Sequence, residues 1–189
     1  MKDILNEFSN EKIIKEYSLK RLIRYNTRMR LTDEDVSQHS YFVSLFCLKL
    51  FQNLDLTIEE KYEILVKSIL HDIAEIETSD LPYDVKEKNP KIKKCLKKIE
   101  KRYYKENWND YFNILYNEKR KQNLILKLAD TYSVFQYTLN ELILGNKNRE
   151  IKEIFYNSQN RINELKEELN DYLKGENKWK KDIKMVIKE

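Results

Sequence analysis

The chain contains almost none of the residues that interrupt helices. Among its 189 residues there are only two glycines and two prolines. These residue types most often end helices and form tight turns. Apolar residues also recur at helical spacing, for example at Val36, Val43, Phe46 and Leu50. The sequence therefore predicts an all-α protein, with no sheet beyond a trivial pair of residues.

The helices can be placed approximately along the chain. We expect helices at about 10–25, from about 36, and at 58–77, 91–107, 121–144 and 148–173. Thr57 and Glu60 form a capping box, and Gly145 provides a helix stop. The segment 77–90 holds both prolines and is the clearest loop. We find no linker or repeat, so we expect one domain over 1–189, with a core at about 10–145 and a partly disordered tail from 175.

The composition excludes several classes of protein. Hydrophobic residues make up 41% and charged residues 36%, which is typical of a folded chain. The net charge of +4 is small and mixed along the sequence, so we expect no polymeric nucleic acid as partner. No apolar stretch approaches the roughly 20 residues that span a bilayer. Cys47 and Cys95 form no close pair. We therefore expect a cytoplasmic protein without a membrane partner.

A small set of imidazoles and carboxylates is able to bind a metal. His39 and His71 are the only histidines, and both lie in predicted helices. Asp72 follows His71 directly, and Asp130 lies within the apolar run LILKLADTYSVF. A carboxylate buried there would need an ion-pair partner, a hydrogen-bond donor or a bound metal. Two imidazoles with two carboxylates suit Mn, Co, Fe, Ni or Zn better than Ca or Mg.

Each of these features is weak by itself. A single helical histidine is more often a core or surface residue than a ligand, and a His-Asp dipeptide is common. Glu75 strengthens the pattern because it shares the predicted helix face of His71 and Asp72. The order is informative: a histidine in one helix, His-Asp after an apolar run, and an aspartate in a later apolar helix.

This ordered set resembles the HD superfamily of metal phosphohydrolases, and more closely its YfbR-like 5'-deoxynucleotidase group. The resemblance rests on IRYNTRMRLTDEDVSQHSYFVS around His39, ILHDIAEIETSDLPYDVK around His71, and LKLAD ending at Asp130. It extends in order and spacing from about Ile13 to Gly145. It implies a helical HD-domain bundle that holds one divalent transition metal, of the kinds named above.

The resemblance also implies roles for individual residues. The metal ligands of the family match His39, His71, Asp72 and Asp130. Its two functional acids match Glu75, which handles the proton of the attacking water, and Asp80. Its substrate contacts match Arg24 and Lys86 for the phosphate and Tyr25 for the sugar. Two positions depart from the family pattern. Ser79 replaces a glycine before Asp80, and Tyr25 replaces a tryptophan, which puts the preference for a 2'-deoxy sugar in doubt.

The expected activity is removal of the 5'-phosphate from a (deoxy)nucleoside monophosphate. Two alternatives remain open: release of triphosphate or pyrophosphate from a (deoxy)nucleoside triphosphate, and a non-catalytic HD domain that binds a nucleotide. The expected partner is a small nucleotide, and the resemblance implies a homodimer. Arg28 and Arg30 are further phosphate candidates because they lie in the loop before His39. The basic run KIKKCLKKIEKR is better explained as a solvated helix face.

Overall fold

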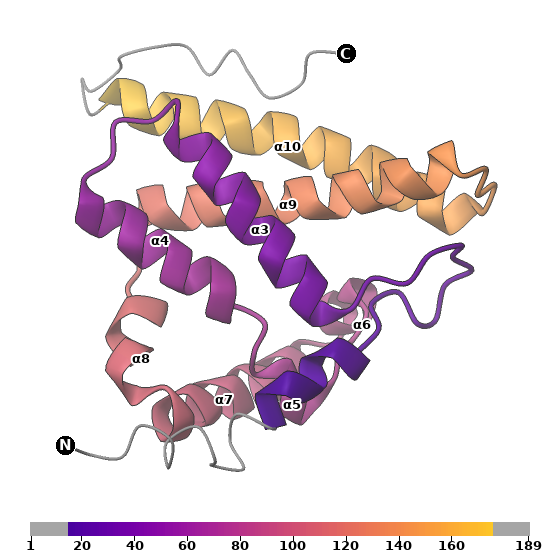
Figure 1. Cartoon of the computed structure of the whole chain (residues 1–189), viewed down its shortest axis with the longest axis horizontal. Coiled ribbons are helices and arrows are strands. Elements are labelled where there is room, and N and C mark those ends of the chain that lie inside the picture. Colours follow the sequence, from indigo (N-terminus) through magenta and orange to yellow (C-terminus); the bar gives the residue numbers. More distant parts are fainter. Residues whose placement is uncertain (1–14, 176–189) are drawn as a thin grey trace.

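The computed structural model describes residues 15–175, and within this range the architecture is helical (Figure 1). The elements are η1 (Ser18–Arg21), α3 (Val36–Phe51), α4 (Ile58–Leu70), α5 (Glu75–Thr78), α6 (Tyr83–Lys88), α7 (Pro90–Asn107), α8 (Asn109–Leu115), α9 (Arg120–Ile143) and α10 (Arg149–Gly175). The tail expected after 175 lies outside the described residues, as do residues 10–14 of the first predicted helix. The expected all-α class is confirmed.

Helices α9 and α10 run antiparallel, and α3 crosses them on one side (Figure 1). Their contact faces are aliphatic, with Val43, Ile125, Leu128, Leu165 and Leu169 completely buried. The Gly145 stop is confirmed: its φ is +95°, and the amide of Asn146 donates to the carbonyl of Glu141 at 2.9 Å. This core fixes the central part of α9, where Asp130 lies.

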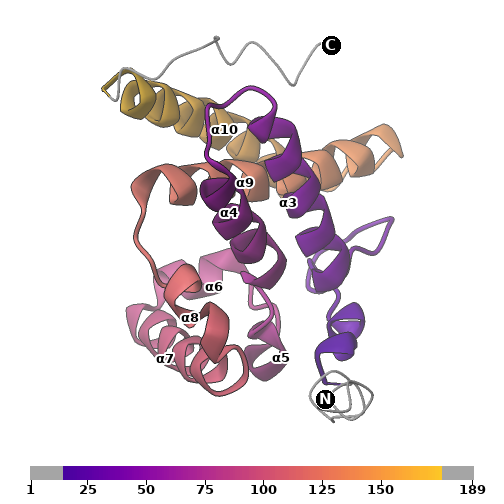
Figure 2. The ribbon, with the colours of Figure 1, turned by 60° about the vertical axis from the view of Figure 1, so that its left-hand side comes forward.

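A second, smaller core lies beneath the end of α4 (Figure 2). Leu70, Ile73 and Ala74 pack there against Tyr103 and Tyr104 of α7. The figure shows α5, α7 and α8 on this side of the molecule, away from α10. The two cores meet at the C-terminal end of α4, so residues just after Leu70 lie between them.

The predicted first helix extends too far. Lys15–Tyr17 are helical and η1 ends at Arg21, after which Leu22 and Ile23 are extended and a turn follows. Ile23 forms an isolated antiparallel bridge with Asp35, through hydrogen bonds of Arg24 N to Glu34 O at 2.8 Å and Val36 N to Leu22 O at 3.0 Å. Backbone pairing with Asp35 therefore replaces the last turn of the predicted helix. This bridge is the trivial pair of residues that the all-α prediction allowed.

The predicted helix over 58–77 is interrupted. The capping box of Thr57 and Glu60 is confirmed, but α4 ends at Leu70 and α5 starts only at Glu75. The phenol of Tyr104 donates to the carbonyls of Leu70 at 2.5 Å and His71 at 2.9 Å. The Leu70 carbonyl also accepts from the amide of Ile73 at 3.1 Å, in a turn, whereas the phenol of Tyr104 is the donor given for the His71 carbonyl within the described residues. His71 and Asp72 consequently lie in a turn and not in a helix.

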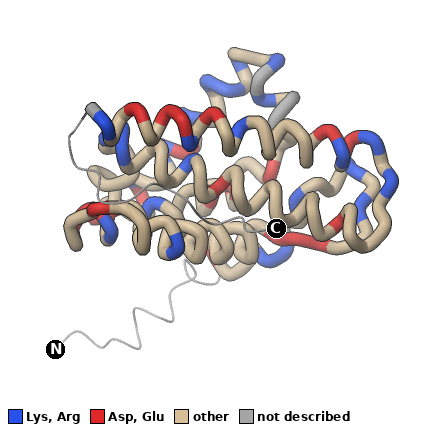
Figure 3. The backbone as a smooth tube through the Cα atoms, turned by 90° about the horizontal axis from the view of Figure 1, so that it is seen from above, with Lys and Arg blue, Asp and Glu red and all other residues tan. Residues whose placement is uncertain are grey.

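The predicted loop over 77–90 is also partly wrong, because α6 forms within it after Pro82. Proline suits a position at the start of a helix, since its missing N–H has no helical partner there. The basic run forms α7 as expected, and most of its lysines are exposed. In Figure 3 basic and acidic residues are mixed along the same helices. No helix within the described range is long and apolar enough to cross a membrane.

Candidate metal centre and active site

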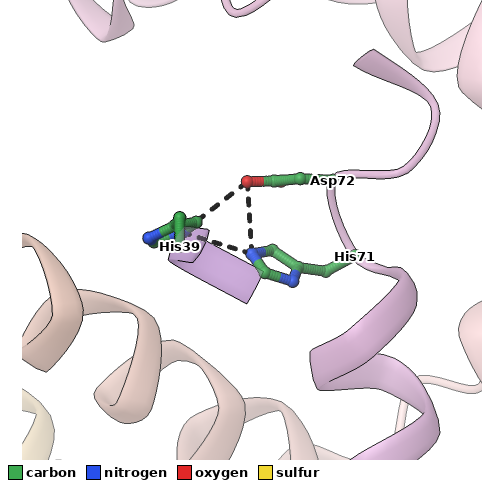
Figure 4. Close-up of side chains that lie close together, drawn as sticks. All are labelled: His39, His71 and Asp72. Atoms are coloured by element: carbon green, nitrogen blue, oxygen red, sulfur yellow. Dashed lines mark hydrogen bonds and ion pairs between the residues drawn. The ribbon is translucent and has the colours of Figure 1, made fainter. Parts of the chain in front are cut away.

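The two histidines approach each other from α3 and from the turn that follows α4. His39 is in the first turns of α3 and is completely buried, and His71 is the residue that caps α4. Their Nε2 atoms are 3.4 Å apart (Figure 4). The Nδ1 atom of His71 lies 2.8 Å from the carbonyl oxygen of Ser68, and Nδ1 of His39 lies 3.0 Å from Oγ of Ser133. A carbonyl can only accept, so Nδ1 of His71 carries a proton and its Nε2 is directed to the centre.

Two aspartates complete the cluster. Oδ2 of Asp72 lies 3.2 Å from Nε2 of His71 and 3.6 Å from Nε2 of His39. Oδ1 of Asp130 lies 3.0 Å from the same His39 nitrogen. His39, His71 and Asp72 each direct one donor atom into a common space, with all three atoms within 4.8 Å of one another (Figure 4). The four side chains that the sequence singled out as ligands are therefore brought together.

This donor set fits a transition-metal ion. Ligand atoms about 2.1 Å from one ion are separated from each other by roughly 3.0–3.4 Å in tetrahedral or octahedral geometry. Three of the separations in the cluster, 3.0, 3.2 and 3.4 Å, match that spacing, and the separation of 3.6 Å between His39 and Asp72 is slightly longer. Burial opposes protonation of His71, yet the adjacent Asp72 carboxylate raises the pKa of His71 to about 9. The carboxylates thus supply the negative charge that a divalent cation requires.

Arg24 lies against the cluster because the bridge between Ile23 and Asp35 directs it inward. Its Nη1 is 3.4 Å from Oδ2 of Asp72, and its Nε is 3.3 Å from Oε2 of Glu34. The second pair is close enough for charge attraction but poorly aligned, so neither atom has a hydrogen-bond partner within the described residues. Arg24 therefore has an unused donor beside the ligands.

Glu75 and Lys86 form a second group at the same place. Glu75 is buried at the start of α5, and its Oε1 lies 3.6 Å from Nζ of Lys86. Burial raises the pKa of Glu75 to about 8, and the charges of Asp72 and Asp80 act in the same direction. Burial likewise raises the pKa of Asp80, and the positive charges of Arg24 and Lys86 act in the opposite direction. A carboxyl group with a pKa near neutrality can exchange protons with water.

Tyr25 lies next to Arg24 but faces another ring. It stacks on Tyr137 of α9, with ring centroids 4.8 Å apart and planes 2° from parallel. Its φ of 54° is in the left-handed region, which is rare for an aromatic residue. Burial raises the pKa of its phenol to about 12, so it is neutral at physiological pH. Tyr137 was not anticipated, although it lies seven residues after Asp130 on the same helix.

Two buried glutamates, one beside Arg24 and one near the end of α9, were also missed. Glu34 contacts Arg24, and burial raises its pKa to about 7. Glu141 of α9 is completely buried and holds the loop that follows Tyr25. It accepts hydrogen bonds from the amides of Leu31 at 2.7 Å and Thr32 at 2.8 Å. An acidic residue within the apolar sequence TLNELIL was a usable signal for Glu141.

Arg28 and Arg30 are placed outside the cluster. Arg28 pairs with Glu150 of α10 at 2.7 Å, and Arg30 pairs with Asp33 at 2.7 Å. Both therefore fasten the loop between η1 and α3, and the structure brings neither into contact with the four clustered ligands.

Similar folds are found among solved structures. A protein of Pyrococcus horikoshii is 24% identical, with a TM-score of 0.68 over 87% of this chain and 94% of its own. An HD-domain phosphohydrolase from Listeria innocua is 17% identical, with a TM-score of 0.69 over 87% and 85% of the two chains. The HD phosphohydrolase DatZ of cyanophage S-2L, bound to dA and one catalytic Zn²⁺, is 16% identical, with a TM-score of 0.67 over 84% of each chain. A search of curated proteins found no match.

The helical architecture is thus that of the HD-domain phosphohydrolases. A family model described as 5'-deoxynucleotidase YfbR-like matches residues 14–176. The chain belongs to the YfbR-like family, and it is a metal-dependent hydrolase that acts on nucleotides.

Proposed function

We propose that the protein removes the 5'-phosphate from a (deoxy)nucleoside monophosphate, using His39, His71, Asp72 and Asp130 as metal ligands. The observation that carries this proposal is the convergence of these side chains beside Glu75, a buried acid whose pKa is raised to about 8. The family description supports the reaction. The dA molecule bound to DatZ supports a nucleoside as the organic part of the substrate.

Each residue has a defined task in this proposal. A divalent metal in the His/Asp cluster supplies a Lewis acid for the phosphate and lowers the pKa of water. Arg24 lies within 3.4 Å of Asp72, so it can bind a phosphate oxygen at the same place and neutralise its charge. Lys86 adds a second positive charge beside Glu75. Glu75 takes the proton from the attacking water, and Asp80 holds the substrate next to it.

The proposed metal is a transition metal, and Zn²⁺ is the first candidate because DatZ carries a catalytic Zn²⁺. The test is a panel of mono-, di- and triphosphate nucleotides assayed with Co, Mn and Zn, with the phosphorus product identified in each case. Inorganic phosphate released from monophosphates supports the proposal. Triphosphate or pyrophosphate released from triphosphates would establish the alternative reaction. Tight nucleotide binding without any product would identify a non-catalytic domain.

We further propose a homodimer formed through one face of α3 and α4. Tyr41, Leu45 and Leu48 of α3 are 61%, 38% and 45% exposed, at spacings of four and three residues. Tyr62 and Ile69 of α4 are also more than half exposed. Ser44 and Ser68 hydrogen-bond at 3.0 Å between the two helices, so these apolar stripes lie side by side. Such faces on soluble proteins usually mark interfaces, and a two-fold axis would pair the face with itself.

Light scattering after size-exclusion chromatography tests this arrangement. Leu45→Glu should convert a dimer into a monomer, whereas Tyr156→Glu on the exposed surface of α10 should not. A monomeric wild-type protein would contradict the dimer. We also propose the cytoplasm as its compartment, supported by the free thiols of Cys47 and Cys95, and cell fractionation tests this.

A further inference from the structure

Glu34 is a buried acid beside the arginine that we assign to the phosphate. It is 6% exposed, although it lies in the loop between η1 and α3. A glutamate is seldom buried unless it is paired, because its charge loses solvation. Its Oε2 lies 3.3 Å from Nε of Arg24, and both side chains are almost completely covered. The burial of this acid is therefore linked to Arg24.

The backbone places these two residues opposite each other. Ile23 and Asp35 form the antiparallel bridge, so Arg24 and Glu34 are the next pair in the same register. The amide of Arg24 donates to the carbonyl of Glu34 at 2.8 Å. Side chains directly opposite each other in an antiparallel pair project to the same side, with Cβ atoms about 5 Å apart. The register of the bridge thus brings the carboxylate to the guanidinium group.

The chain on both sides of Glu34 is held in place. Asp35 caps α3, and its carboxylate accepts from the amide of Gln38 at 2.8 Å. On the other side, the amide of Thr32 donates to the carboxylate of Glu141 at 2.8 Å. Residues that hold a functional side chain must themselves be locked by their neighbours. Glu34 meets this condition, because its loop is attached to both α3 and α9.

Arg24 contacts a second carboxylate at a different point. Its Nη1 lies 3.4 Å from Oδ2 of Asp72, whereas Glu34 contacts its Nε. A planar guanidinium group that is held at two separate nitrogen atoms has a defined orientation. Asp72 is a proposed metal ligand, and a bound cation would share its negative charge. Glu34 is then the carboxylate that remains to Arg24.

We propose that Glu34 is a positioning residue for phosphate recognition, which holds the guanidinium group of Arg24 in the orientation that receives a phosphate oxygen. This inference rests on the proposed function, in which Arg24 binds the phosphate. Glu34 does not contact the phosphate itself, since two negative charges would repel each other. Its effect on turnover therefore depends on the presence of Arg24.

A double-mutant cycle tests this dependence. Glu34→Ala, Arg24→Ala and the double variant are assayed with dAMP at pH 8, above the pKa of about 7 to which burial raises Glu34. Asp33→Ala is the matched control, because Asp33 is the adjacent acid of the same loop, is 66% exposed and pairs with Arg30. Circular dichroism and metal analysis verify that each variant is folded and loaded.

Glu34→Ala should lower kcat/KM about tenfold, because a guanidinium group that is free to turn binds the phosphate less well. In the Arg24→Ala background the same substitution should change kcat/KM less than about twofold, since no guanidinium group is left to orient. Glu34→Gln keeps the shape and an acceptor oxygen but removes the charge, so its loss should be smaller than that of Glu34→Ala. The control should match the wild type.

Binding of the two halves of the product distinguishes positioning from damage to the fold. Inorganic phosphate and deoxyadenosine are titrated by calorimetry into the metal-loaded proteins. Glu34→Ala should weaken phosphate binding about tenfold and deoxyadenosine binding less than about twofold, and Arg24→Ala should show the same selectivity. If Glu34→Ala does not fold, Glu34→Gln supplies the same comparison, because it preserves the shape of the side chain.

Full losses that add in the double variant would overturn the proposal, because Glu34 would then act without Arg24. Equal weakening of phosphate and deoxyadenosine binding would also overturn it and would leave Glu34 a structural role only. Selective loss of deoxyadenosine binding would instead place the nucleoside against Glu34. Failure of the proposed function gives a different result: the wild type would release no phosphate from any nucleotide, whereas phosphate binding and its dependence on Glu34 could still be measured.

Discussion

Buried carboxylates lie in two regions next to α9, and the two regions differ in the hydrogen bonds that the carboxylate oxygens accept. Near the end of the helix, both oxygens of Glu141 accept hydrogen bonds, from Leu31 and Asn146 to one and from the amide and hydroxyl of Thr32 to the other. Near the middle, around Asp130, Oε2 of Glu75 and Oε2 of Glu34 are buried without a hydrogen-bond partner in the described part of the chain.

The electrostatic consequences are opposite. Burial alone would raise all three pKa values, but the donors around Glu141 lower its pKa below the ordinary 4.5. Burial raises the pKa values of Glu75 and Glu34 to about 8 and about 7, although the charge of Arg24 opposes the shift at both residues. A satisfied buried carboxylate stabilises a fold, and an unsatisfied one costs stability. The contrast separates an acid that builds the structure from acids that are available for chemistry.

The largest effect should come from the metal cluster itself. His71→Ala and Asp130→Ala each remove one ligand, and we expect loss of bound metal with a fall in kcat/KM on the order of 10³-fold or more. Elemental analysis of the purified variants, together with circular dichroism to verify folding, provides the measurement. Retention of metal by Asp130→Ala would show that Asp130 is not a ligand.

Glu75→Gln should separate chemistry from stability. We expect kcat to fall by about 10²–10⁴-fold, the usual contribution of a general acid or base, while metal content stays at the wild-type level. Because the pKa of Glu75 is raised, its contribution to stability declines as the pH increases from 4.5 toward about 8. Denaturant unfolding of the metal-free proteins should therefore find the variant at least as stable as the wild type at pH 8. If the Glu75→Gln variant were clearly less stable than the wild type, Glu75 would stabilise the fold as Glu141 does.

Glu141→Gln should behave in the reverse way. Loss of a charged acceptor for four donors should reduce the free energy of unfolding by about 3 kcal/mol at pH 7. The pKa of Glu141 is lowered, so this contribution is complete above the ordinary value of 4.5 and is lost as the pH falls toward the lowered pKa. Unfolding curves at several pH values should accordingly show the two proteins converging in acid. A constant difference down to pH 2 would contradict this account.

Arg24→Ala should weaken turnover of every nucleotide alike. A charge-assisted hydrogen bond to phosphate is worth about 1.5–3 kcal/mol, so kcat/KM should fall by roughly 10- to 100-fold whatever the base or sugar. Steady-state kinetics on several monophosphates would measure this. A defect restricted to one base would mean that Arg24 does not face the phosphate.

The smallest effect concerns the sugar. Tyr25→Trp adds ring bulk next to Arg24, and we expect the ratio of kcat/KM for dAMP to that for AMP to increase by about 3- to 10-fold. Tyr137→Phe is the matched control, because it retains the stacked ring and removes only the hydroxyl that donates to Thr32 at 2.9 Å. An unchanged ratio in Tyr25→Trp would place the sugar elsewhere.

Local patterns in the sequence were sufficient for most of the helical framework. The capping box at Thr57 and the stop at Gly145 depend on residues a few positions apart, and both are found in the structure. The set of His39, His71, Asp72 and Asp130 could be chosen because the chain has only two histidines, and because Asp72 follows one of them directly and Asp130 lies in an apolar run.

The errors arose where distant parts of the chain decide the local structure. Helical periodicity continues through His71, whereas the carbonyl of His71 at the break accepts from the phenol of Tyr104, 33 residues later. The extended segment at Ile23 depends on pairing with Asp35. Phe42 fits the apolar pattern of α3 yet is 45% exposed, because periodicity does not state which faces acquire a neighbour. Glu34 and Glu141 were missed because burial of an acid is a property of the packed structure.

The attachment of the Leu31–Thr32 loop to Glu141 also affects the order of folding. The two ends of this link are about 110 residues apart, and His39 is 94 residues from the Ser133 that orients it. Contacts at such separations form late, because the intervening chain must first lose its freedom. During synthesis from the N-terminus, α3 and α4 emerge long before α9. A nascent chain that ends before Arg120 already carries three of the four proposed ligands, but it lacks the helix that holds them in register.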